Sequence, residues 1–189
     1  MKVVNVLSSH YPGAFISVLL DRFKQGLESE GHTHETIDLY GDRFQPIMQG
    51  DDFNQFFGKP LPQDIVDCHE LLRGADILTF FYPVWWNDMP AIMKGWIDRM
   101  FTMGFAYEAG EHGQKGLLQI KKVLLVCTLG NKKADVSPEL ENAMRVKEAQ
   151  GVFGYCGVQE VEHVFLYDVD NKDKREDYLV QAQDLGIQI

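Results

Sequence analysis

Residues 75–101 read ADILTFFYPVWWNDMPAIMKGWIDRMF, and the pattern within them changes from that of a strand to that of a helix. The unbroken apolar run ILTFFY is typical of a central parallel strand that is buried on both faces. Pro90 suits the first turn of a helix, where its missing N–H breaks no hydrogen bond. Trp85 and Trp86 lie between the two elements. The segment therefore predicts a strand, a loop and a helix, with two large aromatic side chains on the loop.

The same alternation of strand and helix continues on both sides of this segment. Apolar runs predict four further strands, at residues 2–7, 32–40, 121–128 and 161–169. Amphipathic spacing predicts further helices at residues 14–30, 63–73, 137–150 and 173–185. The remaining long segments, residues 41–62 and 104–116, look irregular, apart from one helical turn near residues 52–57. This order predicts an α/β fold, a doubly wound five-stranded parallel sheet with helices on both faces, because each crossover packs back onto the sheet.

The composition excludes several classes of protein. The chain of 189 residues is 45% hydrophobic, so we expect a single domain over residues 1–189 with a core that needs no metal or disulfide. Its net charge of −10 argues against nucleic-acid binding. No apolar stretch approaches the roughly 18–20 residues of a membrane span, and no signal peptide is expected at the start. The three cysteines lack metal-site or disulfide spacing, which predicts reduced thiols in a cytoplasmic protein.

Three loops are the expected functional positions. In a doubly wound sheet, ligands bind beyond the carboxyl ends of the strands, at the point where the strand order reverses. The predicted strands place the loops Ser8–Ala14, Pro83–Met89 and Thr128–Lys133 at that edge. A cofactor or substrate is therefore expected there.

The first of these loops, SSHYPGAF, could hold one phosphate. Hydroxyls and backbone N–H groups at a helix start bind anions, and His10 could pair with the same anion. The loop matches neither the Walker A pattern nor Gly-x-Gly-x-x-Gly, which argues against a nucleoside triphosphate or a Rossmann-type dinucleotide site. An ordinary polar turn with an exposed His10 explains the loop equally well. His32 and His34 have no further ligands nearby, so no metal site is expected.

The two tryptophans of the second loop allow two interpretations. Their rings could stack on a planar heterocycle while loop N–H groups bind its polar edge. They could instead cap the core or fill a dimer interface. Trp96 lies on the apolar stripe of the following helix and is expected in the core or an interface.

The segment YPVWWNDMPAIMKGWIDRMFTMGFAY, residues 82–107, resembles the flavodoxin-like NAD(P)H:quinone oxidoreductases, the DT-diaphorase family. Members share an aromatic-Pro-x-x-Trp-x-x-x-Pro-Ala-x-x-Lys-Gly-x-x-acid-Arg pattern followed by Phe-Ala-Tyr. The upstream segments LYGDRFQPI and DIVDCHELLRGADILTFFYP are similar too, so that the resemblance covers about residues 2–130. It implies a flavodoxin-like sheet of strand order 2-1-3-4-5.

The resemblance also implies a noncovalent flavin, FAD or FMN, at the carboxyl edge of the sheet. NAD(P)H and a small aromatic electron acceptor would then share one pocket, typically in a homodimer. The residues that it assigns to the cofactor are Ser9, His10, Gly13, Ala14, Phe15, Ile16, Ser17, Pro83, Val84, Trp85, Trp86, Asn87, Thr128 and Gly130. Those that it assigns to the substrate are Asn87 and Tyr107, the latter across the dimer interface.

The third loop departs from the family pattern. Many members have Thr-Gly-Gly there, followed by a tyrosine and a histidine that are thought to relay a proton. Residues 128–154 of this chain contain neither tyrosine nor histidine, so we assign no catalytic side chain. Asn87, after the second tryptophan, is a further departure from the usual aromatic or small residue.

The function that the resemblance implies is hydride transfer from NAD(P)H to a bound flavin, followed by two-electron reduction of a quinone or similar acceptor. A flavodoxin-type electron carrier is one alternative, and the acidic charge suits it. A regulatory subunit of a potassium-efflux system is another, because some family relatives have that role. The irregular segments 41–62 and 104–116 favour the enzyme, since they could form walls of a substrate pocket.

Overall fold

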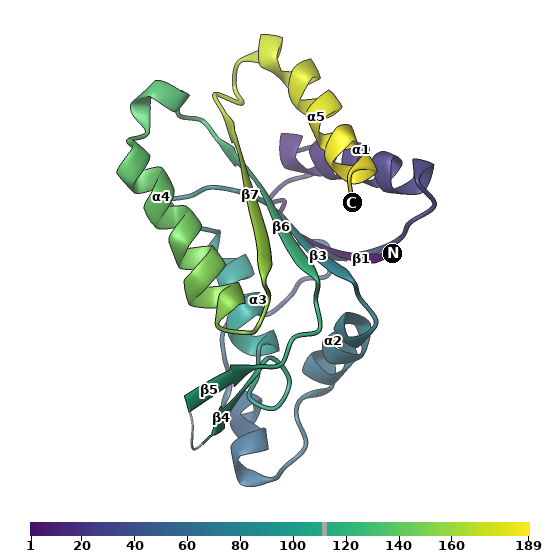
Figure 1. Cartoon of the computed structure of the whole chain (residues 1–189), viewed down its shortest axis with the longest axis vertical. Helices are drawn as coiled ribbons and strands as arrows, with labels where there is room; N and C mark the ends of the chain where they lie inside the picture. The colour runs from purple at the N-terminus through teal and green to yellow at the C-terminus, as the bar shows by residue number, and fades with distance from the viewer. Residues whose placement is uncertain (111–112) are drawn as a thin grey trace.

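The computed structural model of the chain describes residues 1–110 and 113–189, and five parallel strands form its sheet (Figure 1). In spatial order these strands are β2 (Thr33–Asp38), β1 (Lys2–Leu7), β3 (Ile77–Pro83), β6 (Lys122–Leu129) and β7 (Glu160–Tyr167). One face packs against α1 (Phe15–Ser29) and α5 (Arg175–Ile187). The other face packs against α2 (Gln63–Arg73), α3 (Ala91–Met100) and α4 (Pro138–Val146). The predicted parallel sheet of order 2-1-3-4-5 is confirmed, counting only its own five strands.

Side chains of the central strand β3 alternate between two hydrophobic cores. Phe80 and Tyr82 belong to the core under α2, α3 and α4, whereas Phe81 belongs to the core under α1 and α5. Both faces of this strand are covered, which is why its sequence is an unbroken apolar run. One polar pair lies within the sheet, where the Thr79 hydroxyl donates to Asn5 Oδ1 at 2.7 Å, so that neither buried group lacks a partner.

Residues 104–116 contain a hairpin where an irregular segment was predicted. The antiparallel strands β4 (Tyr107–Gly110) and β5 (Gly113–Gly116) form it. The prediction missed them because both strands are short and one of them, GQKG, has no apolar residue. The two strands are held together by their backbone pairing and not by an apolar pattern. A Cβ at Gly116 would lie 2.1 Å from the Gly157 nitrogen, so the two backbones approach closely there. This close approach holds the hairpin against the segment before β7.

The fourth predicted helix also differs from the expectation. It was expected to end at Gln150, and α4 instead continues into a π-helical segment, Lys147–Gly154. Gly151 does not end the helical backbone, which continues through it, and nothing lies within 4 Å of its Cβ position. The π-helical turns place Glu148 and Phe153 in the interior.

A long connection, residues 39–62, joins the end of β2 to the start of α2 and packs against α3. We call this connection the excursion. Its 3₁₀ helix, Gly50–Phe57, includes the helical turn expected from the sequence. The Arg99 guanidinium of α3 holds the excursion by donating to both carboxylate oxygens of Asp52, at 2.9 and 3.0 Å, and to Gln45 O at 3.0 Å. Gly95 lies one turn before Arg99, and a Cβ there would be 2.3 Å from Pro46 O. The Lys-Gly-x-x-Asp-Arg part of the signature therefore fixes this excursion.

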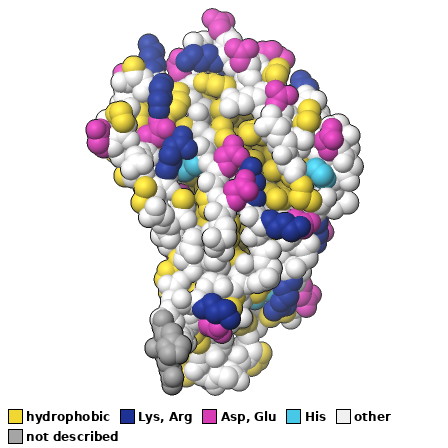
Figure 2. Space-filling model, viewed as in Figure 1, with side chains coloured by type: hydrophobic (Ala, Val, Ile, Leu, Met, Phe, Trp, Pro, Cys, Tyr) yellow, Lys and Arg dark blue, Asp and Glu magenta, His cyan; other side chains and the backbone are white. Residues whose placement is uncertain are grey.

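The face drawn in Figure 2 shows hydrophobic side chains gathered in the strip between α4 and α5, with charged groups among them. Strand β7 forms that edge of the sheet, and Lys122 reaches across to Glu160 and Glu162 at 3.0 and 2.8 Å. Charged side chains on an edge strand disfavour pairing with another sheet. Within the described ranges, every helix is too short or too polar to cross a bilayer. Cys127 and Cys156 are buried and Cys68 is partly buried, and none of the three is in a disulfide among the described residues.

Candidate functional site

The three predicted loops are joined to one another at the carboxyl edge of the sheet. The Ser8 N–H donates to Phe81 O at 2.9 Å, which links the first loop to the end of β3. The Val84 N–H donates to Thr128 O at 2.8 Å, which links the second loop to the third. Strands β1, β3 and β6 are neighbours in the sheet, so their ends bring together segments that are far apart in the sequence.

The first loop presents an uncapped helix start. Gly13 has a φ of 76°, which turns the chain into α1, and Ala14 provides no side-chain cap. No acidic residue lies in the first turn. The Ser17 hydroxyl donates to Ser9 Oγ at 2.6 Å, so that two hydroxyls lie beside the helix start. The Ser17 N–H donates to Ala14 O at 2.9 Å, which leaves the Phe15 and Ile16 N–H groups as the donors of the first turn. The buried Ser8 hydroxyl has no hydrogen-bond partner among the described residues.

An anionic group such as a phosphate fits this arrangement. The first N–H groups of a helix have no intrahelical acceptor, and the helix dipole adds positive potential at the same place. A helix start without a capping side chain or carboxylate leaves these donors available to a ligand. The first turn of α1 consists of Phe15, Ile16 and Ser17, which matches the residues that the resemblance assigns to the cofactor.

The second loop is a tight reverse turn. Trp85 and Asp88 donate their N–H groups to each other's carbonyl oxygens, at 2.9 and 3.1 Å. The two central residues, Trp86 and Asn87, have φ values of 54° and 61°, the combination of a type I′ turn. Asparagine tolerates this conformation well, whereas tryptophan rarely adopts it. A strained residue held by a turn of this kind often belongs to a functional site.

The turn gives the two tryptophans different surroundings. The Trp85 ring lies edge-on to the His10 ring, with 5.1 Å between centroids, and is 41% exposed. The Trp86 side chain is 99% exposed and therefore has almost no packing within the chain. Trp85 thus belongs to the wall between the first and second loops. Trp86 projects its whole ring outward, where only a ligand or another molecule can contact it.

The third loop is tied to the segment after β7. Asp168 and Val169 donate their N–H groups to Asn131 O and Leu129 O, at 2.8 and 3.2 Å. A Cβ at Gly130 would lie 3.4 Å from the Asp170 carboxylate, so this glycine keeps the loop close to that acid. Lys133 lies above the Tyr167 ring, 4.8 Å from its centroid.

A set of buried polar side chains lies beneath the second and third loops. Nε2 of His163 is 3.2 Å from the Tyr82 hydroxyl and 3.4 Å from Cys127 Sγ. Burial raises the pKa of Tyr82 and that of Cys127 well above their usual values, and it lowers the pKa of His163 to about 3. Burial also raises the pKa of Glu148, whose Oε1 is paired with Lys147 at 2.9 Å. These four side chains come from three strands and a π-helical turn, and no sequence motif joins them.

A cavity of about 430 Å³ opens beside the first loop. Ser9, His10 and Ser17, three of the residues assigned to the cofactor by the resemblance, line it together with residues at and after the end of β2. Three further lining residues carried no signal of their own in the sequence, Asp38 at the end of β2 and Tyr40 and Gly41 just after it. Only their position at the carboxyl end of a parallel strand could have identified them.

Tyr107 is not brought to the three loops within one chain. It lies in β4 and packs edge-on against Tyr155, with 5.3 Å between ring centroids. Figure 1 shows the β4–β5 hairpin at the lower end of the molecule, apart from the start of α1. Asn87, the other predicted substrate residue, lies on the Trp85 turn itself. Among the described residues, no group of three or more His, Cys, Asp or Glu side chains could hold a metal ion.

Comparison with known proteins supports a shared fold and ancestry. A family model described as having a flavodoxin-like fold matches residues 1–185. A protein of Haemophilus influenzae, described as an uncharacterised NAD(P)H oxidoreductase, is 30% identical over 161 residues, 82% of this chain and 78% of that protein. The NAD(P)H dehydrogenase (quinone) 1 of Cavia porcellus is 30% identical over 166 residues, which cover 77% of this chain but 60% of that enzyme.

A solved structure gives the same result over nearly the whole chain. The NAD(P)H:quinone oxidoreductase from Methanothermobacter marburgensis superposes with a TM-score of 0.91 at 31% identity, covering 99% of this chain and 98% of that one. The flavodoxin-like fold that the signature segment predicted is thereby confirmed.

Proposed function

The chain belongs to the family with the flavodoxin-like fold, and from this premise we propose that it is a flavin-dependent NAD(P)H oxidoreductase that reduces a quinone or a similar aromatic acceptor. The observation that carries the proposal is the uncapped start of α1, which faces two hydroxyls beside the Trp85 turn. Similarity to relatives described as NAD(P)H oxidoreductases and quinone reductases supports it.

Each loop has a distinct part in holding the flavin, as FAD or FMN. In the first loop, His10, the hydroxyls of Ser9 and Ser17 and the N–H groups of Phe15 and Ile16 would bind the phosphate, with Gly13 and Ala14 forming the turn beside it. In the second, Pro83, Val84, Trp85, Trp86 and Asn87 present ring surface and backbone donors to the isoalloxazine. In the third, Thr128 and Gly130 complete the edge. A bound flavin supplies hydride acceptance from NAD(P)H and two-electron donation to the acceptor.

The protein's own contribution is orientation and exclusion of water. The Val84–Thr128 hydrogen bond fixes the spacing of the second and third loops, and the Trp85–His10 contact closes the wall toward the first. Rigid positioning of two reactants in one pocket supplies much of the rate enhancement in reactions of this kind. We assign no side chain as proton donor.

We further propose that the working form is a homodimer in the cytoplasm, built from chains that are each one domain. The excursion exposes Ile47, Phe53, Phe56 and Phe57, to 67, 43, 49 and 74%. A contiguous exposed apolar segment is typical of an interface. A second copy that covers this segment could also bring its Tyr107 toward the substrate pocket, which the same chain does not do.

The substitution Ser17→Asp tests the phosphate cradle. Aspartate in the first turn of a helix stabilises the helix but repels a bound phosphate. We expect the variant to fold as stably as the wild type. After gel filtration it should retain no more than about one tenth of the flavin that the wild type retains, measured by visible absorbance. Gln63→Asp places the same charge at the start of α2 and serves as the matched control. Equal flavin retention in Ser17→Asp and the control would contradict the proposed cradle.

A second measurement separates an enzyme from an electron carrier. Stopped-flow mixing of the flavin-loaded protein with NADPH or NADH, without oxygen, follows loss of the flavin absorbance. An oxidoreductase is reduced rapidly and is reoxidised by an added quinone. A carrier stays oxidised until a separate reductase is added, and that result would overturn the proposal.

A further inference from the structure

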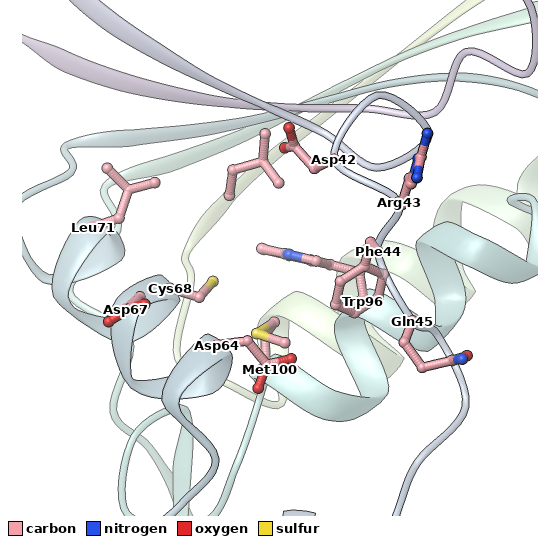
Figure 3. Close-up of a pocket in the computed structure, with 11 residues that line it drawn as sticks. Asp42, Arg43, Phe44, Gln45, Asp64, Asp67, Cys68, Leu71, Trp96 and Met100 are labelled. Carbon is pink, nitrogen blue, oxygen red and sulfur yellow. The ribbon is translucent and has the colours of Figure 1, made fainter.

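A second cavity, of about 490 Å³, lies on the α2 and α3 face of the sheet, away from the three loops (Figure 3). Its floor and walls are mostly apolar and come from β2, the excursion and both helices. The apolar lining residues are Ile37, Phe44, Cys68, Leu71, Trp96 and Met100. Ile37, Phe44, Cys68 and Leu71 are only partly buried, so their side chains are available to a ligand that enters from solvent.

One buried polar group is directed into this cavity without a partner. Trp96 is 1% exposed, and the small part that reaches the cavity includes the edge of its indole ring, whose N–H is bonded to none of the described residues. Figure 3 shows the indole nitrogen on the side of the ring that faces Cys68 across the cavity. A ligand with a suitable oxygen at this place would accept a hydrogen bond from the indole N–H.

The rim of the cavity is acidic. Asp42 and Asp67 lie on it, and neither carboxylate forms an ion pair within the described part of the chain. Asp64 is already paired with Arg99 at 2.7 Å. Arg43 is the cation of the lining, and Figure 3 shows its side chain extending away from Cys68 and Leu71. The unpaired negative charge therefore favours a cation at the mouth of an apolar cavity.

We propose that this cavity is a second ligand site, which binds a small aromatic amine in its protonated form. The ring occupies the space among Phe44, Leu71 and the edge of Trp96. A hydroxyl oxygen on the ring accepts the indole N–H, and the ammonium group lies toward Asp42 and Asp67. Each of these three contacts satisfies one feature of the cavity, namely its apolar walls, its free donor and its acidic rim.

Four related probes test the three contacts separately. Tyramine has the ring, the hydroxyl and the ammonium group, phenethylamine lacks the hydroxyl, tyrosol replaces the ammonium by a neutral hydroxyl, and 4-hydroxyphenylacetate carries the opposite charge. We expect tyramine to bind best and the anion to show no measurable binding. Phenethylamine and tyrosol should each bind about fivefold more weakly, the size of one modest polar contact.

The location of binding is read from the tryptophan indole N–H signals of the ¹⁵N-labelled, flavin-loaded protein. The chain has three tryptophans, and Trp96→Phe identifies the signal of Trp96. Tyramine should shift that signal and leave those of Trp85 and Trp86 in place. Shifts confined to Trp85 and Trp86 would place the amine at the proposed flavin site and would overturn the second site.

The double variant Asp42→Asn, Asp67→Asn tests the acidic rim. Both side chains are exposed, so the exchange should leave the fold intact. We expect about fivefold weaker binding of tyramine and unchanged binding of tyrosol. Glu176→Gln, an exposed acid at the start of α5 on the opposite face, is the matched control and should bind tyramine as the wild type does. Equal tyramine affinity in the double variant and the control would refute the proposal.

Discussion

The imidazole of His163 combines burial with two weak polar contacts. It stacks on Phe165, with 4.1 Å between ring centroids, and lies within 3.2 Å of the Tyr82 hydroxyl. Burial, with the positive charges of Arg145 and Lys147, lowers its pKa from 6.5 to about 3. Between these two pH values the unfolded chain takes up a proton that the folded chain does not. The free energy of unfolding must therefore fall as the pH is lowered through this window.

We predict that His163 accounts for about 2 kcal/mol of the loss of unfolding free energy between pH 7.5 and pH 5. The variant His163→Phe cannot take up the proton, so its unfolding free energy should depend less on pH by that amount. Urea unfolding at the two pH values measures both. Tyr82→Phe keeps the buried imidazole and should keep the pH dependence of the wild type. An identical pH dependence in His163→Phe and the wild type would show that this imidazole is not the cause.

At the scale of elements, α3 serves as the support for the excursion between β2 and α2. Gly95 lets the backbone of Pro46 pass close to the helix, and Arg99 binds the excursion one turn later. Asp52 is held there with a side chain that is 1% exposed, which leaves its charge dependent on Arg99. Gly95 and Arg99, both in the signature, therefore stabilise the excursion in different ways, and a separate variant tests each.

We predict that Gly95→Ala lowers the free energy of unfolding by about 1–3 kcal/mol, because the added methyl group meets backbone atoms that cannot move aside. Chemical denaturation measures the change. The matched control is Gly151→Ala, where nothing lies within 4 Å of the added Cβ. The control should be neutral or slightly stabilising. A loss in the control equal to that of Gly95→Ala would count against the packing explanation.

We predict that Arg99→Met is more damaging, at about 3–5 kcal/mol, because it leaves Asp52 buried and unpaired. Asp64→Asn removes the other ion pair of the same arginine. The Asp64 side chain is 51% exposed, so this change should cost only about 0.2–1 kcal/mol. Denaturation curves of the two variants decide the matter. Similar losses in both would mean that burial does not set the strength of these pairs.

Considering the whole molecule, several large apolar side chains are exposed together in the excursion between β2 and α2. The net charge of −10 disfavours association of two copies through charged faces. The excursion residues Ile47 and Phe57 are 67 and 74% exposed, in contrast, and present apolar surface to a second copy.

We predict that the wild type is a dimer and that Ile47→Asp with Phe57→Asp makes it a monomer, measured by light scattering during gel filtration. Burying two new carboxylates in an interface is unfavourable, which is the reason for the expected dissociation. Val180→Asp is the control, since that valine is 52% exposed on α5 at another face. A wild type that runs as a monomer, or a control that dissociates equally, would exclude this interface.

Much of the fold could be read from local patterns. The run ILTFFY is typical of a central parallel strand that is covered on both faces, and its short length and the proline that follows it favour a strand over a buried helix. The hairpin β4–β5 could not be read, because its two short strands pair through their backbones and β5, GQKG, carries no apolar pattern. The three loops of the candidate site followed from strand order. Their residue assignments came from the signature and stay predictions.

Local sequence patterns were enough to locate the five strands, and the family signature gave their order and the edge of the sheet where a ligand is expected. Only the tertiary structure decided that Trp85 joins the wall of the site while Trp86 projects into solvent, since a positive φ at Trp86 turns the two rings apart. It alone paired Arg99 with Asp52. Hydrophobic periodicity is a local property, whereas such polar contacts depend on how the crossovers bring distant segments together.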